Sequence, residues 1–133
     1  MTTESESTLS VHVFHKGSFP KLPLFDIKND ILGKNYILSV ACIMAKKSEA
    51  LHIQFKHKDG PADILSFPLE TDSGEIILHL PSIRKKAPSY NRTYVEHLLF
   101  ICIHGCLHLK GYTHGHAMEQ QEKIYYKKYL SQI

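Results

Sequence analysis

Hydrophobic and polar residues recur along the chain with two different periods, which separate expected strands from expected helices. Residues 9–15 alternate between apolar and polar side chains, a pattern typical of a strand with one buried face. Residues 36–44 form a nearly continuous apolar run, which predicts a central strand covered on both faces. Two further strands are expected at residues 63–68, where Pro68 ends the strand, and at residues 75–80.

Apolar residues at helical spacing predict the remaining elements. Shorter helices are expected at residues 24–32, 45–55 and 117–131. The longest helix begins at Thr93, because Thr93 and Glu96 have the spacing of a capping box. Its apolar residues line one side and its histidines the other, so this helix should lie between the core and a functional site. The sequence therefore predicts an α+β fold, in which a small mixed sheet of about four strands packs with four to five helices and the long helix is central.

Size and composition indicate one domain. With 133 residues, 43% of them hydrophobic, the chain suits a single compact domain at residues 9–133, after a polar and disordered tail at residues 1–8. No apolar run is long enough to span a membrane, and the N-terminus lacks the features of a secretory signal. Three cysteines are too few for a disulfide framework, and a net charge of +3 is too small to indicate nucleic-acid binding by itself. We therefore expect a cytoplasmic protein with no membrane partner.

Three histidines near the C-terminus have the spacing of a metal site. His104 and His108 lie one helical turn apart on one face, so both rings can reach one ion. Gly111 is expected to end the helix, and the reversed chain can then bring back His114 as a third ligand. The helical pair alone could be a polar stripe, but the third histidine after a helix-ending glycine favours a metal site. Three imidazoles with one open position are expected of a catalytic zinc rather than a closed structural one.

The neighbouring residues narrow the chemistry. Metzincin proteases share the spacing H-x3-H-x2-G-x2-H, but in them a glutamate follows the first histidine as general base, whereas Gly105 stands here. A carboxylate-driven peptidase is therefore disfavoured. On a helical wheel, Cys102 and Cys106 point roughly opposite to the histidine pair, so we interpret them as buried apolar residues. We interpret His97 as a cleft-lining or hydrogen-bonded polar residue rather than a fourth ligand. We interpret His116 as a loop histidine rather than an alternate ligand or proton acceptor.

The histidine segment resembles the signature H-G-x-L-H-L-x-G-Y-D-H of the YbeY family. The positions that match are His104, Gly105, Leu107, His108, Leu109, Gly111, Tyr112 and His114. Thr113 departs from the signature, since the family has aspartate there. The resemblance implies that the three histidines are the ligands of one zinc ion. A hydroxyl at residue 113 can make only neutral hydrogen bonds beside the last ligand, so we expect weaker metal retention or lower activity than in relatives with aspartate.

A second segment resembles the same family, whose pattern there is L-N-x-x-Y-R-x-K-D-x-P-T-D-V-L-S-F-P. The positions in register are Leu51, Phe55, Lys56, Lys58, Asp59, Pro61, Asp63, Ile64, Leu65, Ser66, Phe67 and Pro68. Lys56 stands where the family has an arginine that is thought to matter for activity, and a lysine lacks the planar fork that suits a phosphate. With the next strand included, the resemblance covers roughly residues 36–130.

The YbeY family is described as zinc-dependent, single-strand-specific endoribonucleases that mature ribosomal RNA. The resemblance implies that function for this chain, in particular the late maturation of the 3′ end of the small-subunit RNA, with ribosomal RNA and the ribosome as partners. Lys56 is expected to be catalytic, and Lys56 and Lys58 to contact RNA phosphates. Two alternatives stay open: a ribosome-assembly or RNA-binding factor with a structural zinc, and a metzincin-like hydrolase of other substrates.

Overall fold

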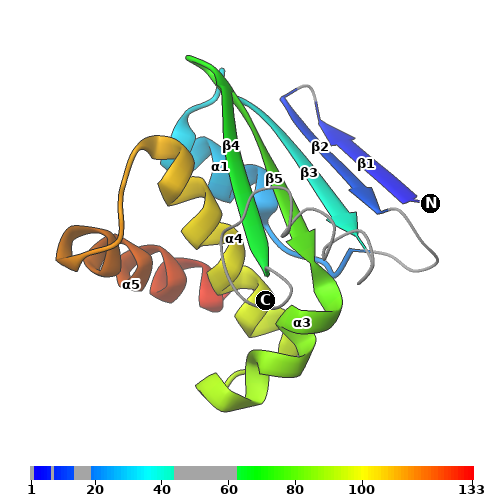
Figure 1. Ribbon diagram of the computed structural model, residues 1–133, viewed down its shortest axis with the longest axis vertical. Helices are drawn as coiled ribbons and strands as arrows, with labels where there is room; N and C mark the ends of the chain where they lie inside the picture. The colour runs from blue at the N-terminus through cyan, green and yellow to red at the C-terminus, as the bar shows by residue number, and fades with distance from the viewer. Residues whose placement is uncertain (1, 7, 14–18, 44–62) are drawn as a thin grey trace.

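A five-stranded mixed sheet forms one layer of the protein, with helices packed against it (Figure 1). The computed structural model describes residues 2–6, 8–13, 19–43 and 63–133. The strands are β1 (Thr2–Glu6), β2 (Leu9–Val13), β3 (Ile37–Ile43), β4 (Ile64–Glu70) and β5 (Ser73–His79). Their order is β1-β2-β3-β5-β4, with β2, β3 and β5 parallel and an antiparallel strand at each edge. The expected α+β class and mixed sheet are confirmed.

Two edge strands differ from the expectation. Residues 2–6, which we expected in a disordered tail, form β1 and pair antiparallel with β2. Their polar side chains gave no strand signal, but an edge strand can be held by backbone hydrogen bonds alone. At the other edge, β4 does not end at Pro68, because the strand continues to Glu70 through an irregularity in its pairing with β5. An edge strand tolerates proline since the missing N–H can face away from its only neighbour.

The central strand β3 is buried mainly on one face. Leu38, Val40 and Cys42 are fully buried, whereas Ile37 at the strand's start is 56% exposed and the alternate residues Ser39 and Ala41 are half-buried. The expectation of full cover on both faces was therefore wrong for the beginning of the strand. Side chains of β2 and β5 on the same face complete the core against the helices.

The helices surround one central helix, α4. They are α1 (Leu24–Leu32), α3 (Leu80–Lys86), the 3-10 helix η1 (Ala87–Tyr90), α4 (Tyr94–Lys110) and α5 (His116–Leu130). Helix α4 contacts α1, α3, η1, α5 and strand β4, so the expected central place of the long helix is confirmed. Helix α3 and η1 had no clear signal in the sequence, and the helix expected at 45–55 lies outside the described residues. No helix in the described ranges is long and apolar enough to cross a membrane.

The ends of α4 follow the expected chemistry. The Thr93 hydroxyl accepts from the Glu96 backbone N–H at 3.1 Å, and the Glu96 carboxylate accepts from the Thr93 backbone N–H at 2.8 Å, which completes the capping box. Gly111 ends the helix with φ +114°, a conformation that favours glycine. In between, Gly105 allows α4 to approach the sheet, because an added Cβ would lie 2.6 Å from the Ile64 Cδ1 atom and 3.0 Å from that of Ile76.

A buried lysine joins α1 to the sheet. The side chain of Lys28 is fully buried, and its ammonium donates to the Thr8 hydroxyl at 2.7 Å. It also donates to three carbonyl oxygens just beyond the end of α1, those of Gly33, Lys34 and Tyr36, at 2.9–3.2 Å. A buried charge is tolerated only when it is well paired, and here oxygen atoms satisfy it. Lys28 therefore fixes the path of the chain from α1 into β3.

Candidate metal centre

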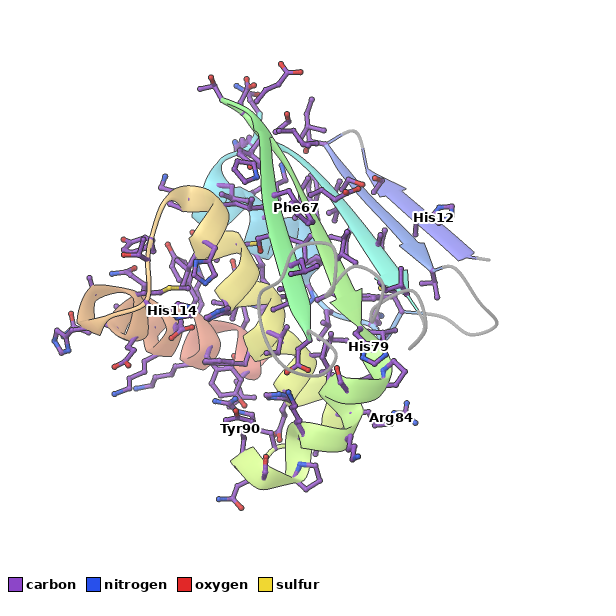
Figure 2. The ribbon with its side chains drawn as sticks, in the orientation of Figure 1. His12, Phe67, His79, Arg84, Tyr90 and His114 are labelled. Carbon is purple, nitrogen blue, oxygen red and sulfur yellow. The ribbon has the colours of Figure 1, made fainter. Side chains whose placement is uncertain are left out.

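His104, His108 and His114 come together at the C-terminal end of α4. Figure 2 labels His114 of this group. One ring nitrogen from each lies within 4.8 Å of the others. The Nε2 atoms of His104 and His108 are 3.1 Å apart, and the ring centroid of His114 lies 5.3 Å from that of His104 and 4.7 Å from that of His108. Within the described part of the chain this is the only group of histidine, cysteine and acidic side chains with such a geometry.

Helix geometry and one glycine produce this convergence. His104 and His108 are one turn apart, so their rings project from the same face of α4. After Gly111, the Tyr112 N–H donates to the Leu107 carbonyl at 3.0 Å, which turns the chain back toward the helix. His114 then lies beside the other two rings, in the connection between α4 and α5. The sequence prediction that these three side chains come together agrees with this arrangement.

Hydrogen bonds orient the rings of the two helical histidines. The Nδ1–H of His108 donates to the Tyr112 carbonyl at 3.0 Å, and the Nδ1–H of His104 donates to the Glu122 carboxylate at 2.5 Å. When both rings are neutral and both Nδ1 atoms act as donors, both Nε2 atoms carry lone pairs directed toward the centre of the group. Two such lone pairs at 3.1 Å repel each other unless a proton or a metal ion lies between them. The donor set therefore fits a metal ion that accepts imidazole nitrogen, such as zinc.

Glu122 was not recognised in the sequence. It lies on α5, only 8% of its surface is exposed, and its carboxylate contacts the ring of His104. A carboxylate that accepts from the second nitrogen of a metal-binding histidine fixes the tautomer and makes the ring a stronger ligand. The signal was its spacing of four residues from Met118, another buried residue of α5. This spacing places Glu122 on the buried stripe of α5 and not on its exposed face.

The site is closed on one side and open on the other. The side chains of His104 and Glu122 are 20% and 10% exposed. His114, in contrast, is an exposed residue. Burial, with a smaller contribution from the nearby His104, lowers the pKa of His108, which favours the neutral ring that a metal requires. Three nitrogens with an exposed side leave space for water or a substrate oxygen.

The family model described as Endoribonuclease YbeY matches residues 22–130. This chain belongs to the YbeY family. The Endoribonuclease YbeY of Geobacillus kaustophilus is 29% identical over 68% of this chain and 67% of the relative, and that of Carboxydothermus hydrogenoformans is 30% identical over 72% and 69%. The solution structure of TM1509 from Thermotoga maritima superposes with a TM-score of 0.61 at 30% identity, covering 92% of this chain and 90% of that one.

Membership of the YbeY family confirms the expectation of a metal-dependent endoribonuclease, an enzyme that hydrolyses RNA. The structure also explains why glycine occupies position 105. The family signature has glycine after the first histidine, and here a side chain at that position would meet Ile64, Ile76 and Ser66 of the sheet. A general base at residue 105 would thus be directed into the packing between α4 and the sheet.

The remaining predicted site residues have different outcomes. Lys56 and Lys58 lie outside the described residues, so their catalytic and RNA-binding roles stay predictions. Thr113 is exposed beside His114, and its effect on the metal also stays a prediction. His116 is exposed and is not part of the histidine group, but it is the first residue of α5 and not a loop residue.

Two other predictions concern the body of α4. Cys102 and Cys106 are buried free thiols, as expected, and burial raises the pKa of both. His97 is also buried, so it does not line a cleft, and its Nδ1 accepts from the Arg92 guanidinium at 3.3 Å. None of these side chains belongs to the metal centre.

Proposed function

We propose that this protein is a zinc-dependent endoribonuclease that cleaves single-stranded RNA and takes part in the late maturation of the 3′ end of the small-subunit ribosomal RNA. The observation that carries the proposal is the convergence of three imidazole nitrogens, with one exposed side, in a member of an endoribonuclease family. Ribosomal RNA and the small subunit would be its partners. We also propose a cytoplasmic location, because the three cysteines are free and the cytosol keeps thiols reduced.

His104, His108 and His114 would hold the ion, one per chain. When bound, a zinc ion supplies positive charge that makes a bound water more acidic and stabilises the charge that develops on a phosphoryl oxygen. Glu122 keeps the Nε2 atom of His104 directed at the centre, and the Tyr112 carbonyl does the same for His108. Both bonds exist before substrate arrives, so the ligand rings need no reorientation during the reaction.

Among the described residues, we find no carboxylate near His104 that is free to act as a general base. Glu122 is the nearest acid, and it is nearly buried and bonded to the far side of that ring. We therefore propose that positioning of the RNA contributes more to the rate than proton abstraction by a side chain. Lys56 and Lys58 remain our candidates for holding the phosphates, with Lys56 acting in the reaction itself.

Metal analysis and RNA cleavage test the proposal together. Elemental analysis of the purified protein should give about one zinc per chain. The loaded protein should cut a single-stranded RNA and leave the same RNA intact once it is annealed to its complement. His114→Ala should abolish cleavage, whereas His116→Ala, a matched change two residues away in an exposed position, should not.

The alternatives predict other results. Digestion of casein without RNA cleavage, lost in His108→Ala, would support a hydrolase of other substrates and end the nuclease proposal. A structural zinc would make His114→Ala lose thermal stability together with RNA binding, because metal binding and folding are then one equilibrium. For an open catalytic site, the same variant should unfold within a few degrees of the wild-type protein.

A further inference from the structure

A single arginine lies among aromatic side chains next to the metal centre. The guanidinium carbon of Arg92 is 4.1 Å from the ring centroid of Phe100, 4.9 Å from that of Tyr126 and 5.5 Å from that of Tyr90. A guanidinium within about 6 Å of an aromatic face is attracted by the ring's electron density. Three rings from η1, α4 and α5 therefore hold this charge in place.

Within the part of the chain that the structure describes, Arg92 uses little of its hydrogen-bonding capacity. A guanidinium carries five N–H donors, and here one nitrogen, Nη1, donates to the Nδ1 of His97 at 3.3 Å. Among the residues that the structure describes, no carboxylate forms an ion pair with it. A fixed guanidinium without a counter-ion is suited to an incoming anion, and its planar fork matches the oxygens of a phosphate.

The arginine cluster adjoins the histidines through helix geometry. Phe100 lies one turn before His104 on α4, and Tyr126 lies one turn after Glu122 on α5. Phe100 is stacked near His104, with ring centroids 6.4 Å apart, and meets Tyr126 edge-on at 5.8 Å. A strand of RNA with a phosphate at the metal centre would therefore bring its neighbouring nucleotide to this cluster.

One ring of the cluster is available to a ligand. Tyr90 is 56% exposed, and it is held in place by stacking on His97, with ring centroids 4.8 Å apart and planes 18° from parallel. Aromatic rings and arginine planes stack on unpaired bases, which a duplex does not offer. A fixed, exposed ring lies here beside a guanidinium that forms no ion pair among the described residues. The two together offer single-stranded RNA a surface for a base and a charge for a phosphate.

We propose that Arg92 and Tyr90 bind the nucleotide adjacent to the cleaved phosphate, with the guanidinium on a phosphate and the tyrosine ring against the base. This inference rests on the proposed endoribonuclease function and adds to it a site for the unpaired strand. It also accounts for a preference for single strands, because a paired and stacked base would not reach the Tyr90 ring.

Binding of a single-stranded RNA analogue to the zinc-loaded protein tests the proposal. The probe is a fluorescent 2′-O-methyl RNA, and the affinity is measured by anisotropy over a range of salt concentrations. Gel electrophoresis after each titration establishes that the probe stays intact. Arg92→Ala should weaken binding about tenfold and reduce the slope of log affinity against log salt by about 0.7, the value for one phosphate contact on a single strand. Arg92→Lys should keep the slope but bind more weakly, and Tyr90→Ala should weaken binding without changing the slope.

The matched control is Arg84→Ala. Arg84 is the other arginine of the chain, and it also lies over a ring, 4.4 Å from the centroid of Tyr94. In Figure 2 it projects from the opposite side of the α3–η1 segment to Tyr90. This variant should bind the probe with the affinity and salt slope of the wild-type protein.

The outcomes separate this inference from the proposed function. Wild-type protein that neither binds nor cuts RNA overturns both. Wild-type protein that binds and cuts RNA, with Arg92→Ala equal to it in affinity and salt slope, overturns the nucleotide site alone. An equal loss of affinity in Arg92→Ala and Arg84→Ala would indicate general charge attraction and would also overturn it. Zinc content and thermal melting of each variant establish that the fold is retained.

Discussion

Glu122→Gln isolates the role of the buried carboxylate behind His104. The substitution keeps the size of the side chain and an oxygen that can accept from the Nδ1–H, but it removes the negative charge. A hydrogen bond to a charged group contributes about 1.5–3 kcal/mol, against about 0.5–1.5 kcal/mol for a neutral pair. Loss of the charge should therefore weaken zinc binding by about tenfold, the lower end for partners of a metal-binding histidine, which corresponds to about 1.4 kcal/mol. Glu122→Ala removes the bond itself and should weaken binding by about 100-fold, the upper end for such partners.

Competition with a chromophoric chelator at neutral pH measures the zinc affinity directly, without reference to catalysis. Glu119→Gln is the matched control, because Glu119 lies on the same helix but is exposed in its first turn. It should bind zinc as the wild-type protein does. Nitrogen chemical shifts of the His104 ring provide a second readout, since the metal-free wild-type protein should hold one tautomer, with the proton on Nδ1.

An unchanged zinc affinity in Glu122→Gln, within about twofold of the wild-type protein, would refute this reasoning. It would mean that the charge of Glu122 does not strengthen His104 as a ligand. A mixture of tautomers in the wild-type ring would refute the orienting role in the same way. Neither result would affect the convergence of the three histidines itself.

Three further changes test other parts of the structure. Gly111→Ala should lower the free energy of unfolding by roughly 1–2 kcal/mol, because residue 111 has a left-handed backbone conformation, and it should also weaken zinc binding. The control is Gly33→Ala, since Gly33 also follows a helix at positive φ and has free space around it. This control should lose stability but keep the zinc affinity. Lys28→Met leaves several buried oxygens without a donor and should lower the free energy of unfolding by about 3 kcal/mol in urea titration; a change below about 1 kcal/mol would contradict the pairing. Burial, with the charge of Arg92, lowers the pKa of His97 below 6.5. As the pH falls below 6.5, the unfolded chain therefore binds a proton at this histidine more readily than the folded chain does, and the free energy of unfolding decreases. His97→Phe should make the unfolding midpoint less sensitive to pH in that range, and an equally steep acid loss would contradict this assignment.

Local chemistry made most of α4 predictable from the sequence. Thr93 and Glu96 start the helix, Gly111 ends it, and the four-residue spacing of His104 and His108 fixes their common face. Each of these signals lies within a few residues, and the structure shows the corresponding hydrogen bonds and backbone angles. The family resemblance added the expectation of zinc and RNA, which spacing alone does not give.

What the sequence did not reveal depends on contacts between distant residues. Glu122 and His104 are 18 positions apart, and only the packing of α5 against α4 makes that carboxylate part of the centre. Arg92 likewise gains its aromatic surroundings from η1, α4 and α5 together. The strand at residues 2–6 is held by backbone pairing, which polar side chains do not signal. Periodicity describes one element at a time and therefore misses such partners.

The orientation of the metal centre depends on a chain of contacts that ends in α1. Glu122 orients His104 only while α5 packs against α4, and hydrogen bonds join the C-terminal end of α5 to α1. The Tyr129 hydroxyl donates to the Asp30 carboxylate at 2.8 Å, and Lys128 donates to the same group at 2.5 Å. The bond from Lys128 is the main reason that the pKa of Asp30 is lowered, so this fastening persists well below neutral pH. The geometry of the three histidines is thus a property of the packed helices α1, α4 and α5, and not of the histidine segment alone.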